Sequence, residues 1–380
     1  MCAGGDISAE FPERASFASI SYANKVWVMG GTSKSAAQID EIYTSTFNGV
    51  ANYIKSPSTF PWWPARANAS TVVHNDIMYI LGGSQPRSGD GTYKCLNDVW
   101  VYADSPGVVE YFLTPGAPRP QLARGESFSS YWLEVTRGIP APWPARWGAY
   151  AVSYNARIWL IGGNDCRTPH GNAFVDLWSS GDARIWRLDK PVAMWSGRNN
   201  IFAALHLGAL YVVASVQKQF YNTFVSVDGI NYQMRENACA LTHVDVVSVV
   251  GFKGYLMAFT IGCHNQLSFD QTAVPCSHPY AGPLENRIYS TRDGKTWSIT
   301  MRPFNIDFFD LAVGKPYLWS STSTGELRFD FKVIIHLDTL FLIGGVKLYA
   351  PLYVLPSLVS LFLHFDFYVC ETIRREFHHK

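Results

Sequence analysis

The sequence predicts an all-β protein built from a repeated unit, and two observations support this prediction. An apolar burst that ends in a glycine pair or its equivalent recurs along the chain, and in five copies an arginine precedes it at a constant offset. The bursts are short and rich in Val, Ile, Tyr and Trp, which is typical of β-strands rather than helices. The five copies run from Arg14 to Gly31, Arg66 to Gly83, Arg146 to Gly163, Arg198 to Ser215 and Arg328 to Gly345, and a degenerate sixth copy ends at Gly262.

The length of the repeat identifies its architecture. Complete copies recur about every 50 residues, which suits four short strands with their turns, the unit of one propeller blade. The second half of a copy supplies an aromatic strand, an Asx-Gly turn and another aromatic residue, as in Asp228-Gly229 before Tyr232. Such dipeptides between apolar runs are strong hairpin signals, because both residues tolerate a positive φ angle. We therefore expect strands a and b, the glycine pair, a loop, strand c, a hairpin turn and strand d in each blade.

This unit resembles the kelch repeat, which also builds the central domain of galactose-oxidase-like proteins. The resemblance lies in the arginine near the start of strand a, the apolar strand b that ends in Gly-Gly, and the aromatic residues of strands c and d. It covers about residues 10–345 and implies an all-β, six-bladed kelch-type β-propeller whose last blade is incomplete or aberrant. The turn Thr291 to Trp297 also resembles the Asp-box of sialidases, but it is one residue shorter and is predicted to be an ordinary hairpin. The structural repeat glycines are Gly30, Gly31, Gly82, Gly83, Gly162, Gly163, Gly344 and Gly345.

The carboxyl-terminal segment, residues 346–380, departs from the repeat. After Gly345 the chain is apolar up to Val369, where the pattern calls for a polar loop and a hairpin. This stretch is long enough to span a bilayer, but its prolines, His364 and Asp366 argue against a membrane helix. Three interpretations stay open: an altered gene end or readthrough sequence, strands c and d of a divergent sixth blade, or a membrane anchor.

Composition narrows the partners and the compartment. The 31 basic and 30 acidic residues give a net charge of +1, which provides no reason to expect nucleic acid or an anionic membrane as a partner. Residues 1–6 lack the basic start and apolar core of a signal peptide, although the amino end of the sequence could itself be cut short. We expect a soluble protein of unassigned compartment. The seven cysteines form no Cys-x-x-Cys pair, so no metal-ribbon site is predicted, and Cys263 and Cys276 are either a disulfide or two free thiols.

The arginines mark one end of the predicted propeller. The b–c and d–a loops meet at the end where strand a begins, and insertions at about 263–286 and 301–327 extend this end. Long loops inside a compact domain are usually functional or disordered. Two interpretations of the arginines are open. Either they line a binding mouth and hold carboxylates, as in kelch families that recognise acidic peptides, or they satisfy loop carbonyls and neighbouring carboxylates between blades. The candidate ligand-binding residues are Arg14, Arg66, Arg146, Arg198 and Arg328.

No catalytic motif accompanies the repeats. The histidines are scattered through different repeats, and neither a nucleophile elbow nor a phosphate loop is present, so no catalytic residue, metal or cofactor is predicted. The sequence favours a non-catalytic interaction module that binds a protein or peptide, with acidic peptides as one candidate, on the arginine-bearing end. The alternative is a carbohydrate-active or sugar-binding propeller of the sialidase or mutarotase sort, which needs arginines and a Tyr/Glu pair that converge on one sugar.

Overall fold

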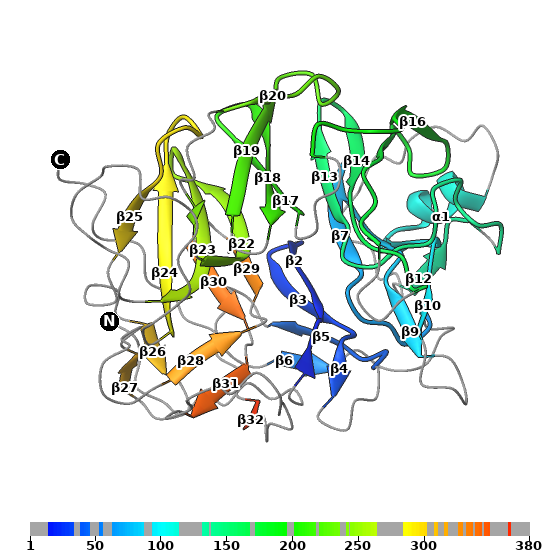
Figure 1. Cartoon of the computed structure of the whole chain (residues 1–380). Coiled ribbons are helices and arrows are strands. Elements are labelled where there is room, and N and C mark those ends of the chain that lie inside the picture. Colours follow the sequence, from blue (N-terminus) through cyan, green and yellow to red (C-terminus); the bar gives the residue numbers. More distant parts are fainter. Residues whose placement is uncertain are drawn as a thin grey trace.

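The computed structural model shows a ring of antiparallel sheets (Figure 1). The structure describes residues 14–33, 39–45, 53–55, 63–86, 93–113, 131–136, 138–167, 172–195, 201–217, 220–235, 241–242, 244–263, 284–301, 308–310, 315–317, 326–329, 332–336, 339–343, 346–349 and 364–365. Among these residues the only helix is α1 (Pro106–Leu113), and all other regular elements are strands. The predicted all-β class is therefore confirmed.

Five blades have the predicted four strands, and neighbouring strands in each blade pair antiparallel in the order a, b, c, d. Blade 4 carries one extra short strand, β21 (Leu241–Thr242), which pairs with its strand c. The blades are β2 (Ala18–Tyr22), β3 (Lys25–Met29), β5 (Ile42–Ser45) and β6 (Tyr53–Lys55); β7 (Ser70–His74), β8 (Ile77–Leu81), β11 (Val99–Ala103) and β12 (Tyr131–Glu134); β13 (Tyr150–Tyr154), β14 (Arg157–Ile161), β15 (Leu177–Ser180) and β16 (Trp186–Lys190); β17 (Ile201–His206), β18 (Ala209–Gln217), β19 (Phe220–Ser226) and β20 (Gln233–Met234); β22 (Val244–Phe252), β23 (Tyr255–Cys263), β24 (Leu284–Thr291) and β25 (Ser298–Met301).

The innermost strands close the ring. Strands β2, β7, β13, β17 and β22 contact one another in this order, and β29 (Lys332–His336) contacts both β22 and β2 (Figure 1). Strand β29 pairs with β30 (Thr339–Ile343), so a two-stranded hairpin occupies the sixth position. Where six blades were predicted, the part of the chain that the structure describes contains five complete blades and this hairpin. The apolar burst at 339–343 is here the second strand of the hairpin, as its place in the repeat predicts.

The remaining strands form small sheets. Strand β28 (Glu326–Phe329) pairs with β31 (Val346–Tyr349), and β31 pairs with β32 (His364–Phe365). Strand β26 (Phe308–Asp310) pairs with β27 (Lys315–Tyr317). The start of the apolar tail therefore joins a sheet, while the rest of the tail lies outside the described residues apart from β32. The three interpretations of residues 346–380 stay open.

The apolar core lies between neighbouring blades. Every residue of β8 is buried, because strand b has sheet neighbours on both sides and blades on both faces. One cluster joins Tyr79 and Val101 of the second blade to Ile158 and Leu160 of the third. The next cluster joins Trp159 to Val212 and Phe224 of the fourth blade. Burial of this kind, at roughly 25 cal/mol per Å² of apolar surface, is what holds blade to blade.

Helix α1 lies in the c–d insertion of the second blade. Ser105 Oγ accepts a hydrogen bond from the N–H of Val108 and caps the helix, and Tyr111 and Phe112 are buried against the blade. The guanidinium of Arg184, which belongs to the c–d turn of the third blade, lies 4.1 Å from the ring centre of Tyr111. The helix therefore lies at the end of the propeller that carries the a–b and c–d turns, which we call the turn face. This is the placement expected for an insertion between strands c and d.

Three c–d turns on the turn face share one hydrogen-bonding pattern. In the fourth blade, Ser226 Oγ donates to Asp228 Oδ1 and accepts the N–H of Gly229, while the same carboxylate oxygen accepts the N–H groups of Ile230 and Asn231. Burial alone would raise the pKa of Asp228, but these hydrogen bonds outweigh it and hold the pKa well below its usual range. Equivalent contacts to the carboxylate occur at Asp182 and Asp293, so the pattern belongs to the repeat.

In the first four blades, the last residue of strand a joins its blade to the next one. Its side chain donates a hydrogen bond to the following blade on the turn face, and in three blades the acceptor is the carbonyl between the Ser/Thr and Asp of the c–d turn. We call these hydrogen bonds the latch contacts. They are Tyr22 Oη to Asp104 Oδ2 (2.6 Å), His74 Nε2 to Gly181 O (3.4 Å), Tyr154 Oη to Val227 O (2.8 Å) and His206 Nε2 to Arg292 O (2.8 Å).

The glycine pairs yield a test of backbone strain. Gly163 has a φ of +90°, and a Cβ there would lie 2.9 Å from Ala149 Cβ and 3.0 Å from Trp147 O. Ser215 occupies the equivalent position of the fourth blade inside strand β18, where no such φ is needed. We expect Gly163→Val to lower the free energy of unfolding by about 1–3 kcal/mol and Ser215→Val to lower it less. Urea unfolding measures both, and equal losses would show that the glycine pairs are not special.

The c–d turn of the fourth blade yields a test by pH. Because the folded-state pKa of Asp228 is depressed, its carboxylate contributes stability above its unfolded-state pKa of about 4. This contribution is lost as pH falls through the folded-state pKa. Asp228→Asn should therefore destabilise the protein at neutral pH by about 1 kcal/mol and reduce the stability lost between neutral and acidic pH. Thermal unfolding across this pH range checks the expectation, and an unchanged acid dependence would contradict it.

Candidate functional site

The candidate site is the end of the propeller opposite the turn face. It is made of the b–c loops, the d–a connections and the arginines that precede strand a, and we call it the arginine face. Arg14 lies in the short strand β1 (Arg14–Ala15), which pairs with β4 (Thr32–Ser33) of the b–c loop. In the second and third blades the residue after the arginine makes a single bridge to the b–c loop, Ala67 to Ser84 and Trp147 to Asn164. The arginine and the b–c loop of each of these blades are therefore adjacent by backbone pairing.

The three repeat arginines whose side chains are described are buried, and each crosses its own blade. The residues Arg14, Arg66 and Arg146 are each only 1% exposed. In each case one terminal amino group donates to the carbonyl of the first glycine of the pair, at 2.8 Å for Arg66 to Gly82. The guanidinium of Arg66 also makes two 2.7 Å hydrogen bonds to the carboxylate of Asp98. The corresponding pairs are Arg14 with Gly30 and Glu41, and Arg146 with Gly162 and Asp176.

The acidic partner begins strand c and holds the aromatic residue two positions later. Asp98 Oδ2 accepts the indole N–H of Trp100 at 2.8 Å, and Asp176 Oδ2 accepts that of Trp178 at 2.8 Å. In the first blade the hydroxyl of Tyr43 donates to Glu41. The carboxylate therefore joins strand a to strand c of its own blade. Because the arginine is buried and its carboxylate partner is mostly covered, such a pair is costly to break once formed.

The backbone of the same arginines reaches the preceding blade. The N–H of Gly31 donates to the carbonyl of Arg66, and the N–H of Arg66 donates to the carbonyl of Ile39. The third blade repeats these two contacts with the second, from Gly83 to Arg146 and from Arg146 to Leu96. One arginine thus connects two blades, the preceding one through its backbone and its own one through its side chain. We call this set of contacts the arginine bridge.

A second set of contacts follows two residues after each arginine. Ser16, Asn68 and Gly148 all have a positive φ, between 52° and 65°. The N–H of Asn68 donates to Ser16 O at 2.8 Å, and the N–H of Gly148 donates to Asn68 O at 2.9 Å. These residues form a hydrogen-bonded arc through the first three blades on the arginine face. This arc was not predicted from the sequence.

Buried tryptophans precede two of the bridges. Trp63 and Trp143 are fully buried, and each lies three residues before its arginine. The guanidinium of Arg66 is 5.1 Å from the ring centre of Trp63, and Arg66 Nε donates to the carbonyl of Pro64. Trp195 is the corresponding residue before Arg198. The repeated run Trp-Pro-Ala-Arg at 63–66 and 143–146 was the signal that could have revealed these residues.

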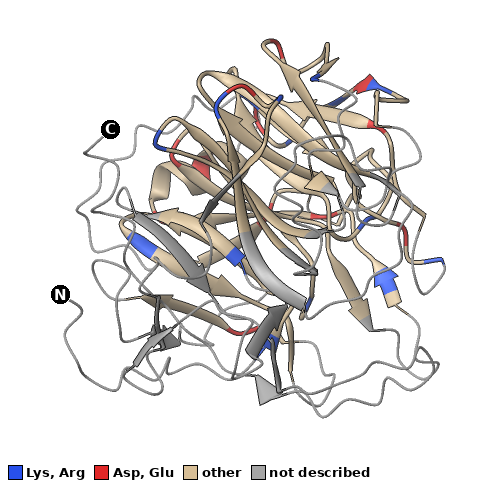
Figure 2. Cartoon of the chain, turned by 60° about the vertical axis from the view of Figure 1, so that its left-hand side comes forward, with Lys and Arg blue, Asp and Glu red and all other residues tan. Residues whose placement is uncertain are grey.

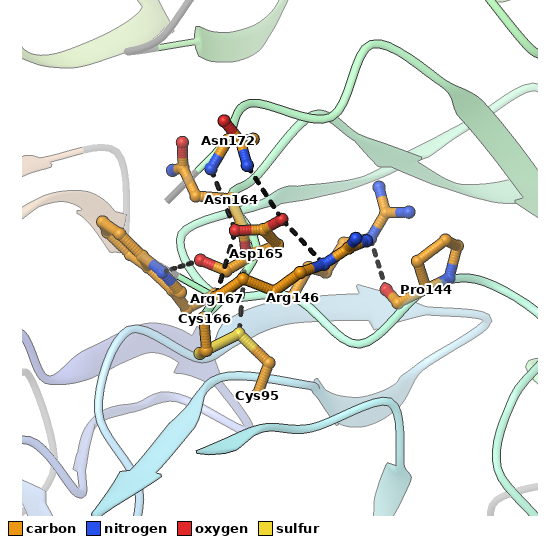
Figure 3. Close-up of a disulfide and its surroundings, with 9 residues drawn as sticks. Cys95, Pro144, Arg146, Asn164, Asp165, Cys166, Arg167 and Asn172 are labelled. Carbon is orange, nitrogen blue, oxygen red and sulfur yellow. Dashed lines mark hydrogen bonds and ion pairs between the residues drawn. A yellow bond between two sulfur atoms is a disulfide. The ribbon is translucent and has the colours of Figure 1, made fainter. Parts of the chain in front are cut away.

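A disulfide joins the b–c loops of the second and third blades. Cys95 and Cys166 are bonded, with their Cα atoms 5.5 Å apart and a sequence separation of 71 (Figure 3). Cys95 ends strand β10 (Tyr93–Cys95), which pairs with β9 (Ser84–Pro86) in the b–c loop. The disulfide predicted as a possibility from the sequence was a different one, between Cys263 and Cys276. The side chain of Cys263 and all of Cys276 lie outside the described residues, so that question stays open.

The structure describes some of the predicted site residues and not others. Arg14, Arg66 and Arg146 lie on the arginine face, and each guanidinium binds a glycine carbonyl and a carboxylate of its own blade rather than of a neighbouring blade. Arg198 lies outside the described residues, and so does the side chain of Arg328 in β28. The two glycines of the first three pairs all have positive φ, whereas Gly344 and Gly345 are outside the described residues. Most of the insertions at 263–286 and 301–327 are outside them too.

The described histidines and acidic residues show no catalytic arrangement. His74 and His206 take part in the latch contacts on the turn face. Within the described ranges, no three His, Cys, Asp or Glu side chains gather as a metal site would require.

The same part of the chain contains no helix long and apolar enough to cross a membrane.

Comparison with known proteins agrees with this architecture. The kelch motif family model matches residues 65–102, the stretch from the first bridge residues of the second blade to its strand c. No curated protein sequence is significantly similar to the chain. The solved structure of YjhT superposes with a TM-score of 0.57 over 90% of this chain and 92% of that one, at 12% identity, which shows a shared fold. The repeat, the five equivalent blades and the motif match together support a kelch-repeat β-propeller.

The arginine bridge yields a test that needs no ligand. Arg66→Ala would leave the carboxylate of Asp98 without its partner and the carbonyl of Gly82 without a donor. Losing one member of a buried ion pair costs about 3–5 kcal/mol, so the melting temperature should fall by several degrees for Arg66→Ala and Arg146→Ala. Arg66→Lys should recover only part of this, because lysine keeps the charge but not the planar fork.

Lys295→Ala on the turn face is the matched control, because Lys295 is exposed and removal of its charge should leave the melting temperature nearly unchanged. Unchanged melting temperatures for both arginine-to-alanine variants would contradict a structural role for the bridge. That outcome would instead favour arginines that serve direct ligand contact.

Proposed function

We propose that the chain is a non-catalytic interaction module that binds a protein or peptide on the arginine face. The observation that carries this proposal is the mutual attachment of the loops on that face. Arginine bridges join the first blade to the second and the second to the third, and the Cys95–Cys166 disulfide adds a covalent link between two b–c loops. Loops held in this way form a preorganised surface, which lowers the entropy cost of binding a partner.

The bridges define what the arginines contribute to such a surface. The charges of Arg14, Arg66 and Arg146 are each neutralised by an acid of the same blade. In our proposal these three arginines position the loops, and exposed loop residues contact the partner. Arg198 and Arg328 stay candidates for direct contact with an acidic peptide.

The same contacts weigh against the sugar-binding alternative. A sialidase-like or mutarotase-like site needs several arginines that converge on one ligand. The three described guanidiniums are instead held apart in three blades, each by its own carboxylate and glycine carbonyl. This supports a broad recognition surface over a single sugar pocket.

The β29–β30 hairpin at the sixth position of the ring is also part of the proposed function. Strand β29 contacts β22 and β2, which is the contact expected of the strand a of a sixth blade. We propose that the β29–β30 hairpin is the inner half of that blade and completes a six-bladed ring. Its b–c loop would then add to the arginine face between the fifth and first blades.

Photo-crosslinking can test which face binds. Peptides that bind the intact protein would be selected from a random library, and a photoreactive amino acid would replace Ser33 or Tyr93 on the arginine face. Matched variants would carry it at Val227 or Lys295 on the turn face. We expect crosslinks to the selected peptides from Ser33 or Tyr93 and none from Val227 or Lys295. Crosslinks confined to the turn face, or a library that yields no binding peptide, would overturn the proposal.

A further inference from the structure

The disulfide brings two exposed basic residues of different blades into one region of the arginine face. Lys94 precedes Cys95 in the second blade, and Arg167 follows Cys166 in the third. Both side chains are exposed, although they are far apart in the sequence. Because the Cα atoms of the two cysteines are 5.5 Å apart, the Cα atoms of Lys94 and Arg167 are at most about 13 Å apart, a distance that one short peptide segment can span. The covalent link therefore creates a pair of cations that neither loop has by itself.

The acidic residues around this pair are already engaged. Asp98 is bound by Arg66, and Asp176 is bound by Arg146. Asp165 lies beneath Arg167 and accepts the backbone N–H groups of Arg167 and Asn172. Burial alone would raise the pKa of Asp165, but these bonds and the charge of Arg167 lower it, so the carboxylate stays ionised. No described acidic residue forms an ion pair with Lys94.

Asp165 also holds Arg167 in a defined orientation (Figure 3). Its Oδ2 atom lies 3.2 Å from Arg167 Nε, while 81% of the Arg167 side chain is exposed. Only the Nε edge of the guanidinium is used in this ion pair. The two terminal amino groups keep the planar fork that matches a carboxylate. An arginine already fixed at one edge loses less entropy when it binds a ligand.

An aromatic residue completes the patch. Tyr93 precedes Lys94 and is 48% exposed. Tyrosine and arginine are enriched among the residues that dominate binding energy at protein interfaces. Elsewhere on the described chain, basic and acidic residues are scattered among uncharged ones (Figure 2). Tyr93 and Lys94 are consecutive in strand β10, so their side chains leave opposite faces of this strand. The two exposed cations, with Tyr93 adjoining them from the other face of β10, form the surface that we call the disulfide patch.

We propose that an acidic peptide segment of a partner docks on the disulfide patch through its carboxylates, with Lys94 and Arg167 as donors and Tyr93 as a packing surface. This inference rests on the proposed function and gives the partner a chemical class. It assigns recognition to loop residues joined by the disulfide, while the arginine bridges of the repeat hold these loops in place.

Fluorescence polarisation with a labelled glutamate-rich peptide tests the proposal on the full-length protein. Lys94→Gln/Arg167→Gln should weaken binding at least about ten-fold with little change in melting temperature, because both side chains are exposed and no new charge is set against Asp165. Lys295→Gln removes one charge on the turn face and should leave the affinity unchanged. Binding by the native protein should also weaken as salt is added, since the contacts are near the surface. Equal affinities for the native protein and the double variant would overturn the proposal.

The role of the covalent link needs a separate variant. Cys95→Ser/Cys166→Ser removes it without leaving a free thiol at either position, and should weaken glutamate-rich peptide binding while the circular dichroism spectrum stays that of a β protein. Unchanged binding by this variant would show that the link does not create the site.

The outcomes also separate this inference from the proposed function. If the glutamate-rich peptide does not bind, but library peptides crosslink to Ser33 or Tyr93, the arginine face binds partners and the acidic class is wrong. If no library peptide crosslinks to either position, the proposed function fails and this inference fails with it.

Discussion

The buried arginine of the repeat is the interaction on which the arginine face depends. A charge that is 1% exposed persists only if its surroundings supply a counter-charge and acceptors, and Arg66 finds Asp98, Gly82 O and Pro64 O within its own blade. These partners come from strand c, the end of strand b and the segment before strand a. A single side chain therefore determines how the loops at one end of a blade are arranged. Its backbone carries the same arrangement into the preceding blade.

Bridges and latch contacts act at opposite ends of the propeller. The bridge joins a blade to the one before it on the arginine face, and the latch contact joins it to the one after it on the turn face. Apolar packing fills the space between, but it is largely non-directional and tolerates small shifts. Directional hydrogen bonds at both ends fix the position of one blade on the next, which packing alone would leave less well defined.

Much of the fold could be predicted because the repeat encodes it locally. Strand b and its glycine pair, and turns such as Asp228-Gly229, follow from the conformational preferences of a few adjacent residues. The acids Glu41, Asp98 and Asp176 stand two residues before an aromatic residue in each blade, so the partners of the arginines were also visible as a pattern. Which acid pairs with which arginine could not be seen in the sequence, because it depends on which strands become neighbours. Helix α1 was not predicted, because Ser105-Pro106 was its only start signal in the sequence. The Cys95–Cys166 disulfide was not predicted either, because its two cysteines lie in different repeats.

The disulfide has a consequence for how the chain becomes folded. It joins residues with a sequence separation of 71. If the disulfide acts through chain entropy, closing a loop of that size raises the free energy of the unfolded chain by about 4 kcal/mol, because it lowers the entropy of that chain. Cys95 cannot find its partner until the start of the third blade has been synthesised, so oxidation couples the maturation of two blades. The gain exists only where thiols are oxidised. In a reducing environment the same sequence would have to hold its second and third blades together by burial and hydrogen bonds alone.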